Sequence, residues 1–343
     1  MQTNTVINGD CLEVLRAMPD ACVHAVVTDP PYGLSKEPDM REVLRHWLDG
    51  DDYKHKGSGF MGRSWDSFVP GPKIWEEVMR VLKPGGHIFS FSGTRTYDLM
   101  VTAMRIAGAE VRDKIDVHCD FSSYVSYMYG SGFPKSLSVS KALDKKNDDE
   151  AKKWEGYGTA LKPASEPIAV FSKGEDTEPP QSPDGTEFYY TAKTPKKERN
   201  AGCEDLYWCD GTPIDKPTYE TMLAENESHK GDKEFKAHKL AQGNVHPTVK
   251  PLKLCRYLVK MVMPPERGLI IDPFCGSGSI LCAAVLEGHD YIGIDIEESS
   301  CQIARARVLH HSGEELESTE LPKRKIPKRA MPNKIAKKIL RSF

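Results

Sequence analysis

The chain has 343 residues, of which 39% are hydrophobic and 28% charged, and its net charge at pH 7 is -3. These values are ordinary for a folded, water-soluble protein, and they exclude one that binds nucleic acid through an excess of positive charge over the whole chain. No apolar run approaches the ~20 residues that span a bilayer, and the first residues lack a secretory leader pattern, so we expect a cytoplasmic protein without membrane contact.

The first clear pattern is a short β-branched run that ends in prolines. Val23 to Val27 predicts a buried strand, which stops at Asp29-Pro30-Pro31-Tyr32. The polar, glycine-rich segment that follows, from Ser35 to Pro70, predicts a loop.

Regular elements continue as far as about residue 115. Ile74 to Leu82 has helical spacing and ends at a Lys-Pro-Gly-Gly sequence. His87 to Phe91 predicts a strand, and Thr96 to Ala107 predicts a helix. From Asp116 to Asn244 the alternation fades, which indicates an insertion with irregular structure and not a continuation of the sheet.

Alternation returns after residue 248. The predicted order is helix, strand, helix, strand, helix, over Leu252 to Met263, Leu269 to Asp272, Ser279 to Leu286, Tyr291 to Asp295 and Ser299 to His310. Strands that alternate with helices predict an α/β fold, with a doubly wound, mostly parallel sheet and helices on both faces.

A glycine-rich turn in this part joins a predicted strand to a predicted helix. Asp272 ends the strand, and Gly276 and Gly278 allow the backbone to approach a ligand closely. Asp295 ends the next strand, where a carboxylate accepts hydrogen bonds from ribose hydroxyls. The third glycine of the dinucleotide pattern is missing, which favours an adenosine with a short amino-acid arm over a dinucleotide. The alternative is a tight turn without a ligand.

The D-P-P-Y sequence lies at the carboxyl end of its strand, the edge where open α/β sheets bind ligands. The Asp29 carboxylate and the Pro30 carbonyl are suited to accept the two N–H bonds of an exocyclic amine on a base, which makes that amine more nucleophilic. Pro31 restrains the backbone, and the Tyr32 ring is suited to stack on a base that has left its duplex. The alternative is a strand end with a proline-rich turn and a half-buried tyrosine.

Together the two sites resemble a known family, the permuted beta class of DNA amino-methyltransferases. TDPPYGL precedes HPTVKPLKL and DPFCGSGS in that order, and the likeness covers residues 5 to 310 apart from much of the middle. RVLKPGGHIFSFSG and GSGFPKSLSVSKALD are similar to further family segments, the latter to a subgroup common in phages and mobile elements. The resemblance implies a Rossmann-like methyltransferase fold with circularly permuted motifs.

The resemblance also assigns cofactor contacts. It implies S-adenosylmethionine as methyl donor, with its methionine arm near Asp272, Phe274, Gly276 and Gly278 and its ribose on Asp295. Asp10, in INGDCLEVL, resembles the family acid near the cofactor adenine, and Lys250, in HPTVKP, falls in the segment that closes the cofactor pocket.

Four ranges follow from this interpretation. Residues 1–115 form the catalytic half, 116–244 an inserted target-recognition region, 245–311 the cofactor half and 312–343 a basic tail. Lysines and aromatic residues in the middle range are candidates for contacts to phosphates and bases, although each one alone is equally a solvated or core side chain. The tail is either a phosphate-binding arm or a disordered end.

The sequence therefore predicts methylation of N6 of adenine in double-stranded DNA by a monomer or homodimer. Methylation of N4 of cytosine by the same machinery is an alternative. Adenine is favoured because family members that methylate cytosine more often carry Ser where Asp29 stands. A non-catalytic DNA-binding protein with a relic cofactor site is an alternative of another class.

The nine cysteines include no C-x-x-C pair, so we expect reduced and mostly buried thiols. Cys203 and Cys209 precede His229, His238 and His246 at spacings that fit no standard zinc pattern. Methyl transfer of this kind needs no metal, and we expect no metal site.

Overall fold

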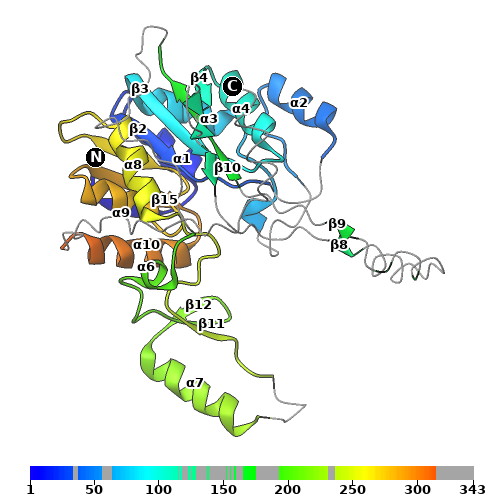
Figure 1. Ribbon diagram of the computed structural model, residues 1–343, viewed down its shortest axis with the longest axis vertical. Coiled ribbons are helices and arrows are strands. Elements are labelled where there is room, and N and C mark those ends of the chain that lie inside the picture. The colour runs from blue at the N-terminus through cyan, green and yellow to red at the C-terminus, as the bar shows by residue number, and fades with distance from the viewer. Residues whose placement is uncertain are drawn as a thin grey trace, which may run out of the picture. The chain divides into compact units, whose positions relative to one another are not determined.

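A computed structural model describes most of residues 1–313 (Figure 1). The described residues are 1–33, 38–55, 64–114, 116–117, 123–124, 126–128, 137–138, 152, 155, 158–159, 165–174, 193–230 and 236–313. Residues 1–313 form one compact unit and 314–343 a second. The predicted basic tail falls almost entirely in the second unit, outside the described residues.

The first unit is built on one eight-stranded, mixed sheet. Its strand order is β1 (Thr5–Asn8), β15 (Asp290–Asp295), β14 (Leu269–Asp272), β2 (Val23–Thr28), β3 (Leu82–Phe91), β10 (Ser165–Ser172) and β4 (Glu110–Lys114), with β7 (Ser126–Met128) also paired to β10. The strands from β1 to β3 are parallel, and β10 is antiparallel to both of its long neighbours.

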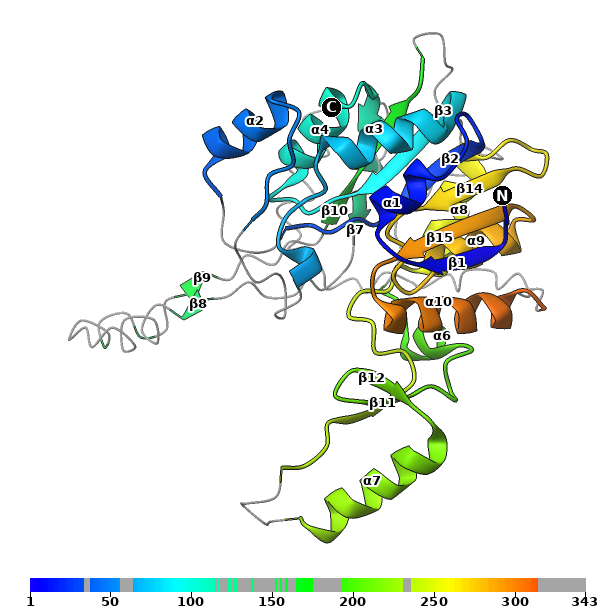
Figure 2. The ribbon, with the colours of Figure 1, turned by 180° about the vertical axis from the view of Figure 1, so that it is seen from behind.

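Helices cover both faces of the sheet (Figures 1 and 2). Successive strand residues alternate between two cores, since Ile270 packs in one and Ile271 in the other. The first core is completed by α8 (Leu252–Val262), α9 (Ser279–Leu286) and α10 (Glu298–His311). The second is completed by α1 (Cys11–Arg16), α2 (Met40–Leu48), α3 (Pro72–Val81) and α4 (Tyr97–Ile106). The doubly wound α/β fold predicted from the sequence is confirmed.

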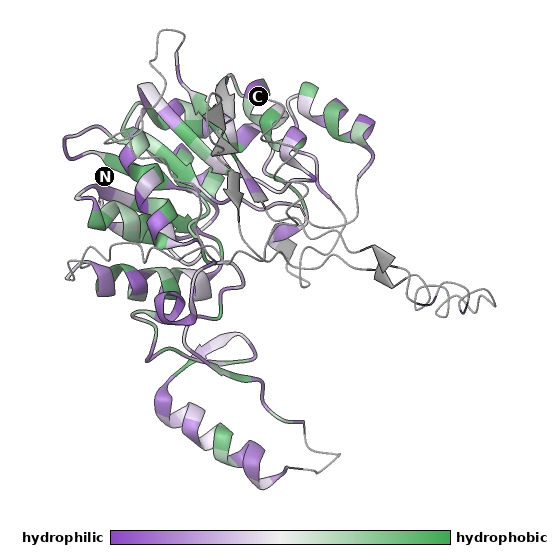
Figure 3. Ribbon diagram, in the orientation of Figure 1, coloured by the Kyte–Doolittle hydropathy of each residue, from purple (hydrophilic) through white to green (hydrophobic). Residues whose placement is uncertain are grey.

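A smaller three-stranded sheet packs beside α10. It comprises β11 (Tyr207–Cys209), β12 (Thr212–Ile214) and β13 (Leu240–Gln242), and its neighbours are α6 (Lys196–Asn200) and α7 (Lys216–Ser228). Cys203 and Trp208 form its core with Ile303 of α10. Helix α7 buries no residue and is mostly hydrophilic (Figure 3). Two further short strand pairs are antiparallel: β5 (Asp116–Val117) with β6 (Ser123–Tyr124), and β8 (Leu137–Ser138) with β9 (Gly158–Thr159).

Two expectations about irregular segments are wrong. The range from Ser35 to Pro70 contains α2, whose Val43 and Trp47 are buried, and the short 3-10 helix η2 (Ser64–Asp66). Strand β10 falls inside the range expected to stand apart from the sheet, yet it lies between β3 and β4. It is the buried neighbour of two strands and therefore carries the apolar run Ile168 to Phe171.

Among the described residues, the structure has no helix that combines the length and the apolarity needed to cross a bilayer.

Candidate active site

Both sequence motifs lie at the carboxyl edge of the sheet, on neighbouring strands. Strands β2 and β14 are parallel, with Val26 opposite Ile271. The Thr28 hydroxyl donates a 2.6 Å hydrogen bond to Oδ1 of Asp272 and so ties the end of one strand to the end of the other. The D-P-P-Y segment and the glycine turn, more than 240 residues apart in the chain, therefore open into the same space.

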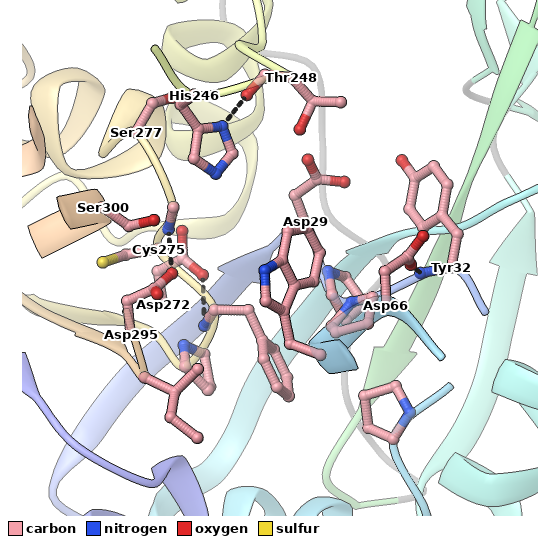
Figure 4. Close-up of a pocket in the computed structure, with 18 of the residues that line it drawn as sticks. Asp29, Tyr32, Asp66, His246, Thr248, Asp272, Cys275, Ser277, Asp295 and Ser300 are labelled. Atoms are coloured by element: carbon pink, nitrogen blue, oxygen red, sulfur yellow. Dashed lines mark hydrogen bonds between the residues drawn. The ribbon is translucent and has the colours of Figure 1, made fainter. Parts of the chain in front are cut away.

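That space is a cavity of about 530 Å³ (Figure 4). Ten of the eleven site residues predicted from the sequence line it: Asp10, Asp29, Pro30, Pro31, Tyr32, Lys250, Asp272, Phe274, Gly276 and Asp295. Gly278, the eleventh, lies behind the wall as the N-cap of α9. In Figure 4, Asp272, Asp295 and Ser300 lie on one side of the cavity, and Tyr32 and Asp66 on the other.

Asp272 is the most buried carboxylate of the cavity, at 1% exposed. Burial raises its pKa to about 7, although hydrogen bonds from the Thr28 hydroxyl and the Phe274 amide oppose the shift. A buried acid near neutrality becomes charged most readily when a cation lies beside it.

The buried side chain of Arg307 fixes the conformation of the glycine turn. Gly276 and Gly278 have φ values of +48° and +72°, which only glycine adopts without strain. Nη1 of Arg307, on α10, donates to the Ser277 carbonyl at 2.7 Å and to the Ser279 hydroxyl at 3.0 Å. Arg307 is fully buried, so it fixes the turn without touching the cavity.

Asp295 is the last residue of β15, and Asp10 lies two residues after the end of β1. Asp295 accepts hydrogen bonds from the amides of Gly276 (2.9 Å) and Glu297 (2.8 Å), and burial raises its pKa to about 6. Asp10 caps α1 by accepting the amides of Leu12 and Glu13. Both side chains thus have fixed positions on the cavity wall.

Asp29 has one engaged and one unengaged carboxylate oxygen. Its Oδ2 accepts a hydrogen bond from Nζ of Lys250. Its Oδ1 is buried and has no hydrogen-bond partner within the described part of the chain. A buried carboxylate oxygen without a partner is costly, so this atom is poised to receive a donor from a ligand.

Tyr32 is held at three points. Its hydroxyl donates to Oε2 of Glu166 at 3.1 Å, its amide donates to Asp66 at 2.8 Å, and its carbonyl accepts the Thr96 hydroxyl at 2.6 Å. Burial and the carboxylates of Asp29 and Glu166 raise the pKa of the hydroxyl well above its ordinary value, so the tyrosine is neutral.

Lys250 lines the same cavity as the glycine turn, and its ammonium lies at the D-P-P-Y side. The ammonium contacts Asp29 and lies 3.3 Å from Oε2 of Glu166. The segment that carries Lys250 also borders the glycine turn, because His246 lies against Gly276.

The sequence reasoning missed Glu166, Asp66 and Arg307. Glu166 lies just before the apolar run of β10. That run predicts a buried strand, and a residue at its start could have been expected at an edge of the sheet. Asp66 lies within the segment interpreted as a loop, and Arg307 acts from inside a helix. Nothing local in the sequence distinguishes these last two from ordinary charged residues.

One group of described residues brings three metal-type ligand atoms within 4.8 Å of one another: Cys209, Asp210 and His238. None of them lines the cavity. Of the other cysteine and histidine residues considered for zinc, Cys203 is in the core beside α10 and His246 is in the cavity wall.

Comparisons with known proteins agree with this geometry. Type II methyltransferase M.HindIII of Haemophilus influenzae is 23% identical over 322 residues, which are 88% of this chain and 94% of that protein. The PvuII DNA methyltransferase (cytosine-N4-specific) has a similar fold, with a TM-score of 0.52 at 13% identity over 94% of this chain and 89% of that one. The M1.HpyAVI–SAM complex aligns with a TM-score of 0.47 at 14% identity, over 89% of this chain and 98% of that one.

The profile of the DNA methylase family matches residues 23–306, a range that includes both motifs and the strands that carry them. The chain thus belongs to the DNA methylase family and is a DNA methyltransferase that uses S-adenosyl-L-methionine.

Proposed function

We propose that the protein methylates N6 of adenine within a specific duplex DNA sequence, after the base has left the helix. The observation that carries this proposal is the buried, unpartnered Oδ1 of Asp29 in a cavity shared with the glycine turn. An exocyclic amine inserted there would give that oxygen its missing donor.

The cavity residues fit the cofactor. The positive-φ glycine turn allows close approach, and Asp295 and Asp10 are in place for the ribose and the adenine. S-adenosyl-L-methionine supplies the electrophilic methyl group when bound. We propose that Asp272, Phe274, Gly276 and Gly278 shape the turn around its methionine arm, as the family resemblance implies.

Asp29 and Pro30 act on the amine. The lone pair of an exocyclic amine is conjugated with the ring, so the amine is a weak nucleophile. Asp29 Oδ1 and the Pro30 carbonyl would accept its two N–H bonds and favour the pyramidal form, in which the lone pair is available. As the N–C bond forms and the sulfur–methyl bond breaks, the nitrogen would become positive, and Asp29 would accept its proton.

Tyr32 and Pro31 would hold the flipped base. The Tyr32 ring lines the cavity and is fixed by Glu166, Asp66 and Thr96. A fixed aromatic ring loses no further freedom when a base stacks on it, which favours the extrahelical state.

Adenine is favoured over cytosine by the Asp29 in D-P-P-Y. We also propose, from the motif order, that the chain belongs to the permuted beta class, and, from its GSGFPKSLSVSKALD segment, that it belongs to the phage-type subgroup. Recognition of the target is proposed for residues 116–244. Mass spectrometry of nucleosides from DNA treated with the protein tests the base. N6-methyladenine is the expected product, and N4-methylcytosine would establish the alternative.

Replacing Asp295 by alanine should weaken cofactor binding and leave the fold intact. A carboxylate that holds hydroxyl groups contributes roughly 1.5–3 kcal/mol, equivalent to about a 10- to 150-fold loss of affinity. Calorimetric titration with S-adenosyl-L-methionine measures the loss, and the thermal midpoint of the free protein serves as control. Unchanged affinity would remove Asp295 from the ribose site.

Cofactor affinity should rise with pH up to about 7 and level off above it. Burial raises the pKa values of Asp295 to about 6 and of Asp272 to about 7, so in the free protein both acids become ionised as the pH rises through these values. The ionised acids attract the cofactor's sulfonium and ammonium, and binding therefore releases protons. Titrations in buffers of different ionisation enthalpy should detect this release. In Asp272→Asn the upper part of the rise should disappear, and a flat profile in the unaltered protein would contradict the prediction.

A further inference from the structure

We propose that Lys250 and Glu166 are positioning residues for methyl transfer: the ammonium holds one oxygen of Asp29 so that the other faces the target amine, and Glu166 keeps that ammonium from neutralising the acceptor. This inference rests on the proposed function and assigns to Lys250 a role on the substrate side of the cavity.

Three separate elements supply this group. Asp29 follows β2, Glu166 lies on β10, and Lys250 comes from the segment before α8. The ammonium contacts Oδ2 of Asp29 and lies 3.3 Å from Oε2 of Glu166, and the lysine side chain is only 7% exposed. It also lies 4.9 Å from the centre of the Phe91 ring, which shields it from water. A buried ion pair of this kind fixes orientation more than it adds stability.

The charges of the group do not cancel. Burial lowers the pKa of Lys250, but Asp29 and Glu166 raise it further, so the net shift is upward and the lysine is charged. Two carboxylates share one ammonium, which leaves one net negative charge when all three are ionised. That charge favours the positive charge that develops on the amine nitrogen.

Without Lys250, the carboxylates of Asp29 and Glu166, each 21% exposed, would lie close together with no counter-ion between them. Two like charges in such a site favour the protonated form of one of the carboxylates. Among the described residues, Asp29 also interacts with the neutral Tyr32 hydroxyl, the acidic Asp272 and the Cys255 thiol, and none of these supplies a positive charge. A protonated Asp29 no longer accepts the amine proton, so transfer should fail at neutral pH and recover at higher pH.

The test uses full-length Lys250→Met, Glu166→Gln and the double variant, in single-turnover methyl transfer at saturating DNA and cofactor across pH. We expect Lys250→Met to slow transfer at least 100-fold at pH 7, to move the acid limb of the rate profile upward by at least one pH unit, and to leave cofactor affinity within about threefold. Lys260→Met, at the far end of α8, is the matched control because its amine pairs with Glu287 outside the cavity.

The double variant gives the decisive comparison. Removing the Glu166 charge should speed transfer in the Lys250→Met background, although Glu166→Gln alone should slow it about tenfold. Lys250→Arg retains the positive charge and should keep the acid limb of the rate profile in place. It therefore separates the loss of the charge from a loss of folding caused by substitution at this site. Losses that multiply in the double variant, or a Lys250→Met defect confined to cofactor affinity, would overturn the positioning role. A wild-type protein that methylates no DNA would instead overturn the proposed function.

Discussion

Asp29→Ala should abolish methyl transfer while most of the binding of DNA and cofactor remains. The substitution removes a cavity-lining carboxylate whose buried Oδ1 has no hydrogen-bond partner among the described residues. Losing a preorganised electrostatic partner costs about 10²–10³ in rate, and Asp29 would also serve as the proton acceptor, so we expect at least that loss. Transfer of a labelled methyl group in a single turnover is the measurement, and Asp49→Ala, at an exposed site after α2, is the control.

Tyr32→Ala separates chemistry from base flipping. With 2-aminopurine at the target adenine, Asp29→Ala should keep the fluorescence rise of an unstacked base. Tyr32→Ala should reduce that rise, since a stacking contact contributes roughly 1–3 kcal/mol per base. If Asp29→Ala turned over duplex DNA at a near-normal rate, the catalytic assignment of D-P-P-Y would have to be abandoned.

Gly278→Val should eliminate measurable cofactor binding and lower the thermal midpoint. Gly278 has a φ of +72°, and a Cβ there would lie 2.9 Å from Cβ and 3.0 Å from Cα of Ala304. The Cα belongs to the backbone of α10, so it cannot move aside alone. The turn would shift instead, with the Ser277 carbonyl that Arg307 holds. We expect at least a 100-fold loss of affinity, measured by calorimetry.

Gly288→Ala is the matched control for backbone strain. Gly288 has a φ of +80°, but a Cβ there would meet no atom within 4 Å, and the residue does not line the cavity. Its cost should be about 1–2 kcal/mol of unfolding free energy, with unchanged cofactor affinity. Equal affinity losses in the two variants would mean that strain, and not the close approach to α10, governs the turn.

The parts of the fold that could be predicted from the sequence are those with a strong local signal. Two short runs rich in β-branched residues, Val23 to Val27 and Leu269 to Asp272, are each followed by proline, and this pattern predicts buried strands. Their neighbouring positions follow from the rule that ligand sites gather at the carboxyl edge of a parallel sheet. The shared cavity could therefore be anticipated from two motifs far apart in the chain.

Helix α2 and strand β10 each have a local sequence pattern of their own, but the neighbouring sequence or the distant partners hid them from prediction. Helix α2 has an Asp39 cap and buried residues four apart, Val43 and Trp47, but polar and glycine-rich segments flank it. Strand β10 has an apolar run, yet its partners β3 and β4 both come earlier in the chain. Local pattern does not reveal pairing of this range.

Side-chain partnerships depend on tertiary structure alone. Lys250 lies within the predicted cofactor half, residues 245–311, and the resemblance gave it a cofactor role. The structure brings its ammonium to Asp29, 221 residues away in the chain. Arg307 lies in a helix whose pattern explains its burial but not its contact with the glycine turn.

The strand order also dictates when the protein can fold during its synthesis. Among the described strands, β1 pairs with β15 alone, so the first strand to leave the ribosome finds its partner only after about residue 295 has emerged. One edge of β2 pairs with β14 and therefore stays unpaired until residues 269–272 have been made. Until then β2 exposes an unpaired edge next to apolar residues, a state prone to association with other chains. Contacts that span more than 240 residues also form slowly. A chain that stopped before β14 would lack the cofactor site and the middle of its sheet as well.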